Sequence, residues 1–145
     1  MISFSIPGKP QGKARARTVY NPNIKRSVSY TPEKTMLYEN FIKTMYLNKY
    51  QDMKYCKDKP LYITIFAYFP VPKSVSKKRK HDMLCNVEKP TKKPDIDNIA
   101  KVILDALNGI AYDDDAQIVA LSIYKFYDDI PRVDVTISPC GLSPE

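Results

Sequence analysis

The chain has few of the residues on which several common kinds of site are built. Its four glycines are not clustered, so it has no glycine-rich phosphate-binding loop. The cysteines, Cys56, Cys85 and Cys140, are odd in number and form no Cys-x-x-Cys pair, which argues against a disulfide framework and a zinc site. The single histidine, His81, lies in a lysine-rich run and is a poor candidate for a catalytic triad.

Long apolar runs are also missing. No stretch reaches the length of a membrane span, and the N-terminus lacks the basic-then-apolar pattern of a secretory signal. We therefore expect a cytoplasmic protein with no membrane partner. A length of 145 residues is typical of one domain with a substantial core, so we expect residues 1–145 to form a single domain.

Positive charge is in excess and unevenly spread. The formal net charge is +7. Residues 1–34 hold seven Lys and Arg against one Glu, and residues 73–93 hold eight against two acids, so each balance is +6 and the remainder carries −5. Cationic regions attract polyanions by counterion release, although many cytosolic proteins are mildly basic. Two basic regions beside an acidic focus favour nucleic acid as the partner.

Five segments have strand-like patterns. Residues 2–6 alternate apolar and polar, as in a strand with one buried face. Residues 13–17 also alternate, with three cations on one face, which is typical of a solvated edge strand. Residues 61–69 are apolar and aromatic on both faces, which predicts a central strand covered on two sides. Residues 117–127 and 132–138 predict a terminal hairpin.

Two segments have helical periodicity. Apolar residues from 37 to 46 predict a core-packing helix that Thr31 caps, with Pro32 in its first turn. A second stripe predicts a helix capped by Asp95 or Asp97 and ended by Asn108-Gly109. Its members are Ile96, Ile99, Ala100, Ile103, Leu104 and Leu107.

The remaining segments are connections. Residues 19–30 contain Asn-Pro-Asn and predict a turn between two short extended pieces. Residues 73–94 form a long basic connection with room for a short helix. The order of elements predicts an α/β (α+β) fold in which two main helices pack on a mixed sheet.

The acids concentrate between residues 93 and 117. Asp95 and Asp97 can converge if the helix begins between them, and Lys101 lies one turn after Asp97 on the same side. The run Asp113-Asp-Asp115 follows that helix. Two carboxylates about 4 Å apart repel by roughly 4 kcal/mol at an effective dielectric constant of 20, so such a cluster calls for a cation. Mg²⁺ prefers oxygen ligands, and a lysine beside it would stabilise charge in the transition state of phosphodiester hydrolysis.

Each acid taken alone has an ordinary explanation. Asp95 suits a helix cap, Asp97 and Lys101 suit an exposed i,i+4 pair, and the three consecutive aspartates suit a polar turn. A calcium EF-hand is excluded because Ala100 stands where its glycine is needed. The conjunction of these acids on a basic chain favours a metal-dependent nuclease.

The order of these residues resembles a known family. The segment Lys93-Pro-Asp-Ile-Asp-Asn-Ile-Ala-Lys101, followed by Asp105-Ala-Leu107 and Asp114-Asp-Ala-Gln117, resembles the RusA family of Holliday junction resolvases. Residues 10–17 and 30–33 are similar to the opening segments of that family.

The resemblance implies a mixed-sheet RusA-like fold and a homodimer that nicks opposed strands of a four-way DNA junction. It further implies Mg²⁺, with Mn²⁺ as an alternative ion, bound by Asp95, Asp97 and Asp115, with Lys101 as the essential lysine. The roles of Asp113 and Asp114 stay open.

We therefore expect a Mg²⁺-dependent, structure-selective endodeoxyribonuclease that resolves Holliday junctions by paired symmetric nicks in DNA recombination and repair, without a small-molecule cofactor. The candidates for phosphate contacts are Lys13, Arg15, Arg17, Lys92 and Lys93. One alternative is a non-catalytic module that binds branched DNA, in which the acids serve only as helix caps and turn residues. The other is a metal-dependent nuclease for flaps or single strands.

Overall fold

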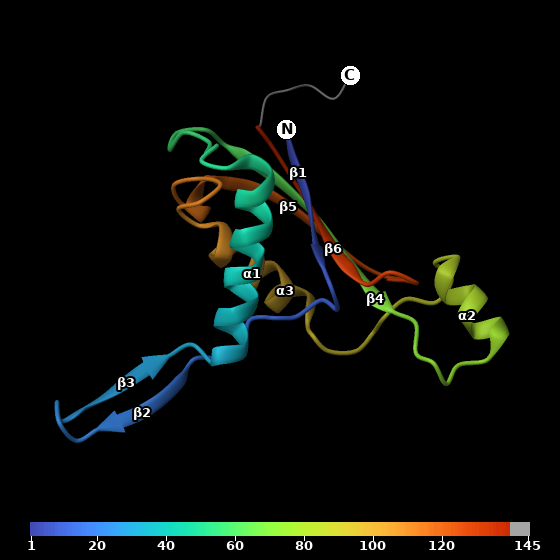
Figure 1. The fold of residues 1–145 in the computed structure, drawn as a ribbon, viewed down its shortest axis with the longest axis horizontal. Coiled ribbons are helices and arrows are strands. Elements are labelled where there is room, and N and C mark those ends of the chain that lie inside the picture. Colours follow the sequence, from blue (N-terminus) through green and yellow to red (C-terminus); the bar gives the residue numbers. More distant parts are fainter. Residues whose placement is uncertain (140–145) are drawn as a thin grey trace.

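The computed structural model describes residues 1–139, which form a four-stranded mixed sheet, a two-stranded hairpin and three α-helices (Figure 1). In chain order the elements are β1 (Ile2–Pro7), β2 (Arg17–Asn21), β3 (Arg26–Tyr30), α1 (Glu33–Tyr50), β4 (Leu61–Pro70), α2 (Lys77–Leu84), α3 (Ile96–Leu107), the short 3-10 helix η1 (Asp115–Gln117), β5 (Ile118–Asp128) and β6 (Arg132–Pro139). The predicted mixed α+β fold is confirmed.

The strands of the main sheet lie in the order β1-β6-β4-β5. β4 pairs in parallel with β5 and antiparallel with β6, which in turn pairs antiparallel with β1. The predicted hairpin at the C-terminal end is therefore wrong, because β4 lies between β5 and β6. The inward-facing residues of β4 are all apolar and buried. The central position of this strand in the sheet accounts for that burial.

The core lies between one face of the sheet and the helices α1 and α3. Tyr38, Ile42 and Tyr46 of α1 are buried, as are Ile99 and Ile103 of α3. Burying a large apolar side chain contributes about 1.5–3 kcal/mol, so these two stripes hold both helices on the sheet. The stripe on α1 is narrower than its sequence predicts, because the side chains of Leu37 and Phe41 are exposed.

The opposite face of the sheet corrects another prediction. Strand β4 is covered on one side, whereas Tyr62 on its outer side is 43% exposed. Phe66 stacks on Tyr124 of β5 across that outer face, with ring centroids 5.4 Å apart. Both large helices that pack on the sheet lie on its inner face, so the aromatic side chains of the outer face cover one another instead.

The edge strand predicted for residues 13–17 is wrong, because the chain has no strand between the end of β1 and Arg17, where β2 begins. This segment lies across the start of α3, where the backbone N–H of Lys13 donates to the carbonyl oxygen of Asn98 at 2.8 Å. A Cβ atom on Gly12 would stand 2.9 Å from Cβ of Pro94 and 3.0 Å from Cβ of Asn98, so glycine is needed for this close approach.

The helix boundaries agree with the sequence patterns in most places. Helix α1 begins after Pro32, and no side chain caps it, so the predicted Thr31 cap is wrong. Helix α2 occupies part of the basic connection and is capped by the hydroxyl of Ser76, which accepts from the N–H of Arg79. Gly109 has a φ of 78°, as expected for the end of α3. No helix within residues 1–139 combines the length and the apolar composition needed to cross a membrane.

Candidate active site

An open cavity of about 470 Å³ lies between α3 and the edge strand β5. Three carboxylates and one ammonium group line it: Asp97, Lys101 and Asp105 from α3, and Asp115 from η1. Ile96, Ala100 and Leu104 of α3 and Leu121 and Ile123 of β5 form its apolar part. Ile96 is exposed and borders this cavity rather than the core, where the helical stripe had placed it, whereas Leu104 borders the cavity and also packs against the core.

Local geometry explains why the charged groups share one side of α3. Residues 97, 101 and 105 are four apart, so their side chains follow one another along a single helix face. Asp97 lies in the first turn, where the helix N-terminus stabilises negative charge. Asp115 belongs to η1, which comes immediately before β5. Because β5 pairs with β4, this strand passes beside α3. The fold thus places Asp115 in the same cavity as Asp97 and Lys101.

Asp105 forms ion pairs with two lysines of the site, and the sequence interpretation assigned it no role. Its carboxylate lies 3.5 Å from Nζ of Lys101 and 3.3 Å from Nζ of Lys13. Lys13 also contacts the carboxylate of Glu39 on α1. Partial burial works to lower the pKa of Lys13, but the hydrogen bond and charge of Glu39, followed by those of Asp105, leave that pKa raised. The i,i+4 spacing from Lys101 is the signal that could have identified Asp105.

The three consecutive aspartates have different partners. Asp113 pairs with Lys54 at 2.7 Å, and the carboxylate of Asp114 accepts from the N–H of Ala116 at 3.3 Å as the cap of η1. Asp115 is the member of this run that lines the cavity between α3 and β5. Asp113 and Asp114, whose roles the sequence left open, have partners outside this cavity or within the turn.

The cavity carries an excess of negative charge around Asp115. A hydrogen bond with Asp114 is the largest cause of its raised pKa, followed by burial and by the negative charges of Asp114 and Asp105. Lys101 acts in the opposite direction. A cation bound between these carboxylates would relieve this repulsion.

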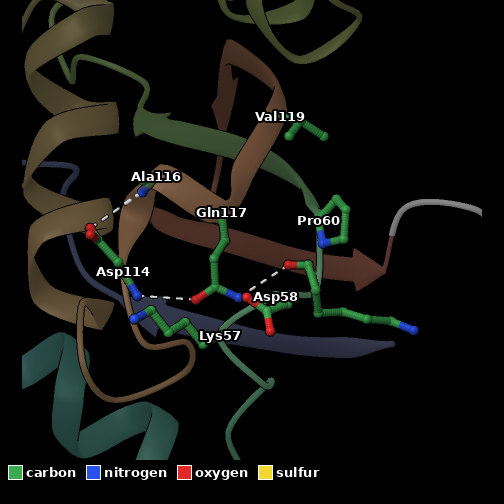
Figure 2. Close-up of a pocket in the computed structure, with 8 residues that line it drawn as sticks. Lys57, Asp58, Pro60, Asp114, Ala116, Gln117 and Val119 are labelled. Atoms are coloured by element: carbon green, nitrogen blue, oxygen red, sulfur yellow. Dashed lines mark hydrogen bonds between the residues drawn. The ribbon is translucent and has the colours of Figure 1, made fainter.

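Gln117 fixes the position of the acidic turn (Figure 2). Its buried amide donates from Nε2 to the carbonyl oxygens of Cys56 and Lys59, at 2.6 and 3.1 Å. Its Oε1 accepts from the backbone N–H groups of Asp113 and Asp114, at 2.9 and 3.0 Å. These four hydrogen bonds tie η1 to the loop before β4. The spacing Asp114-x-x-Gln117 is a capping box, a sequence signal that was available.

Asp95 is not among the residues that line the cavity. It precedes α3 in extended conformation, as the sequence predicts, but its side chain makes no cap hydrogen bond. Its carboxylate accepts from Nζ of Lys93 at 2.9 Å.

Nearby, Nζ of Lys125 donates to the carbonyl oxygens of Lys92 and Pro94. Burial lowers the pKa of Lys125, and the negative charge of Asp95 opposes that shift. Lys125, which the sequence interpretation missed, thus anchors the approach to α3.

The candidate phosphate contacts fall into two groups. Lys13 is engaged with Asp105 and Glu39, inside the site. Arg15 and Arg17 are exposed and have no ion-pair partner among residues 1–139, and the exposed side chains of Lys92 and Lys93 lie just before α3. Four of the five candidates are therefore accessible on the surface.

The donor set suits a hard divalent cation. Within residues 1–139, no three Asp, Glu, His or Cys side chains are arranged as a ready-made metal site. Mg²⁺ does not require one, since it is usually bound through one or two carboxylates together with waters and substrate phosphates. Asp97 and Asp115 share one cavity and provide such a pair, with oxygen donors alone.

Comparison with known proteins matches most of the chain to a family. Residues 7–138 match the family model described as Endodeoxyribonuclease RusA. The chain is also 33% identical over 139 residues to the uncharacterized protein YqaN of Bacillus subtilis (strain 168), and the alignment covers 94% of each chain. All the residues of the cavity between α3 and β5 lie within the matched ranges.

Proposed function

This chain belongs to the RusA family of endodeoxyribonucleases, and from that membership we propose that it is a Mg²⁺-dependent enzyme that resolves Holliday junctions by paired symmetric nicks. The observation that carries the proposal is the single cavity in which α3 and η1 bring Asp97, Lys101 and Asp115 together. Acids from two separate elements meet there on a chain of net charge +7. If each acid only capped a helix or a turn, there would be no reason for them to line the same cavity.

Each group in the site has a distinct proposed role. When bound, Mg²⁺, or Mn²⁺ in its place, supplies a Lewis acid for the phosphate and a hydroxide at neutral pH. Asp97 and Asp115 would hold the ion, and Asp95 would be available as a third ligand once its carboxylate is released from Lys93. That release is easy because the Asp95–Lys93 pair is exposed, and exposed ion pairs contribute little stability. Lys101 stabilises the negative charge that develops on the phosphoryl oxygens.

Asp105 is a positioning residue in this scheme. Because it forms ion pairs with both Lys101 and Lys13, it holds the Lys101 ammonium at the cavity edge while its own charge stays compensated. Glu39 holds Lys13 from the side of α1. Residues of the N-terminal segment, α1 and α3 thus form one chain of ion pairs that ends at Lys101.

The proposed assembly is a two-fold homodimer in which residues 1–145 act as a single RusA-like endonuclease domain. Each chain has one such cavity in its described part and makes one cut, whereas a two-fold symmetric junction needs two matched cuts. Arg15, Arg17, Lys92 and Lys93 are the proposed phosphate contacts that hold the branched DNA around the acidic site.

The test is nicking of a synthetic four-way junction with and without Mg²⁺, beside flap and linear duplex substrates of equal concentration. We expect metal-dependent, paired nicks in the junction. Asp97→Asn should abolish nicking yet keep junction affinity in EDTA, or tighten it by removing a repulsive charge.

Asp113→Asn is the matched control, because Asp113 pairs with Lys54 outside the cavity between α3 and β5. It should retain nicking. Junction binding by wild type without any nicking would identify a non-catalytic module, and preferred cutting of flaps would identify the alternative nuclease. A large loss of binding in Asp97→Asn with an intact fold would contradict the role assigned to that residue.

A further inference from the structure

The β2–β3 hairpin projects away from the sheet and the helices (Figure 1), and the proposed cleavage chemistry does not use it. All of its strand residues are exposed except Asn21, which is half-buried. Among residues 1–139, its side chains hydrogen-bond only within the hairpin, as in the 3.1 Å contact between Thr18 and Ser29. An isolated two-stranded hairpin is at best marginally stable in water, so this one is expected to act against a partner surface.

The charge of the hairpin specifies the partner. Residues 1–32 contain no Asp or Glu. Arg17 and Arg26 lie on the same face of the ribbon, because Arg17 opposes Tyr30 and Arg26 opposes Asn21, four residues along β2. Lys25 lies in the connecting turn. None of these three cations has an ion-pair partner among residues 1–139, in contrast to Lys13, so they are free to meet a polyanion.

The remaining side chains of the ribbon suit a nucleic acid groove. On the face of the two arginines, Val19 opposes Val28, and both are exposed. On the other face Tyr20 is 61% exposed and stands beside the hydroxyls of Thr18 and Ser27. Cations and hydroxyls contact phosphates, while apolar side chains contact sugars and base edges. A two-stranded ribbon fits the major groove of undistorted duplex DNA, which is about 12 Å wide, whereas the minor groove of about 6 Å has to be deformed to admit it.

We propose that the β2–β3 hairpin is a DNA-binding arm that lies in the major groove of a duplex arm of the substrate. Arg17 and Arg26, about 13 Å apart along the ribbon by strand geometry, neutralise separate phosphates. The proposal rests on the proposed nuclease function for its substrate. It adds a surface that holds duplex DNA through a part of the chain that makes no contribution to the core.

The decisive variant is the double substitution Arg17→Gln and Arg26→Gln. Affinity for a fluorescent duplex and a four-way junction is measured in EDTA over a range of salt concentrations. Loss of two phosphate contacts should reduce the slope of log K against log salt by about two. The same relation predicts roughly 60-fold weaker binding at 0.1 M salt.

The matched control is Lys57→Gln with Lys59→Gln. These exposed lysines follow the C-terminal end of α1, whereas the hairpin precedes its N-terminal end, and an 18-residue helix is about 27 Å long. The control removes the same charge and should leave the slope near that of wild type. Equal slopes for the two double variants would overturn the proposal.

Two further measurements separate this proposal from protein–protein contacts and from the nuclease function. Tyr20→Ser should weaken binding without changing the salt slope, since it removes an uncharged contact. The arginine variant should keep the thermal unfolding midpoint of wild type, because the hairpin makes no contribution to the core. An altered oligomeric state with an unchanged salt slope would show that the hairpin contacts a second copy, and the proposal would be wrong. If wild type fails to nick, the nuclease proposal fails, whereas the binding experiment in EDTA still decides the role of the hairpin.

Discussion

The substitution Gln117→Glu tests how the acidic turn is held. It keeps the size of the side chain and the oxygen that accepts from the N–H groups of Asp113 and Asp114. It replaces the Nε2 donor, so the carbonyl oxygens of Cys56 and Lys59 lose their hydrogen bonds and face a carboxylate oxygen instead. The variant should be less stable, and the turn that presents Asp115 should move.

The magnitude follows from the lost contacts. Each of the two lost hydrogen bonds contributes about 1 kcal/mol net, and the buried carboxylate oxygen at position 117, left without a donor, costs about 1–3 kcal/mol. A destabilisation of about 3 kcal/mol at pH 7 is a reasonable total. At this chain length that corresponds to a fall of about 10 °C in the thermal unfolding midpoint.

The effect should also depend on pH in a defined direction. The introduced carboxyl is buried and faces carbonyl oxygens, so its pKa in the folded state lies above the unfolded value of about 4.3. The destabilisation is then complete at neutral pH and shrinks as pH falls toward that unfolded value, where the protonated carboxyl donates again.

The measurement is the unfolding free energy of wild type and variant between pH 4.5 and 7.5, followed by nicking activity. Gln51→Glu is the matched control, because Gln51 is exposed and its side chain makes no hydrogen bond within residues 1–139. It should change stability little at any pH. A Gln117→Glu variant as stable as this control, or one whose deficit grows as pH falls, would refute the reasoning.

Three other substitutions probe the site. Asp105→Asn should lower kcat for nicking about 10- to 100-fold with a smaller change in KM, since Lys101 loses its partner, and Asp105→Glu should restore part of the rate. Asp114→Asn keeps a capping side chain but removes a negative charge, so the pKa of Asp115 should fall and the acid limb of the pH–rate profile should move to lower pH. An unchanged acid limb would contradict the coupling between those two carboxylates. Gly12→Ala should cost about 1–3 kcal/mol in thermal unfolding, because its Cβ atom would meet side chains at the start of α3 within 3.0 Å.

Some features of this protein follow from neighbours in the chain. The period of α3 places Asp97 and Lys101 on one face, and Gly109 ends that helix through its positive φ. The same period identified Ile96 as a core residue, yet it is 41% exposed and borders the cavity between α3 and β5. Periodicity specifies that a stripe exists, but the width of its buried part depends on what packs against it.

The strands show the same division. Alternation and composition identified β4, β5 and β6, but their order in the sheet depends on pairing between distant segments. The apolar composition of both faces of β4 predicted cover on two sides, whereas α1 and α3 both lie on one side and leave Tyr62 and its neighbours on the other face. No local pattern specifies on which face of a sheet a helix will pack.

For the site, the sequence alone determined which residue types are present and that Asp97 and Lys101 share a helix face, because those properties depend on spacings of a few residues. The family resemblance named Asp115, but only the tertiary structure decided that Asp113 and Asp114 lie outside the cavity and that Asp105 lines it. The physical reason is distance along the chain. The turn is held by hydrogen bonds from Gln117 to residues 56 and 59, and Asp105 receives Lys13 from the N-terminal segment, and such contacts exist only once the chain has folded.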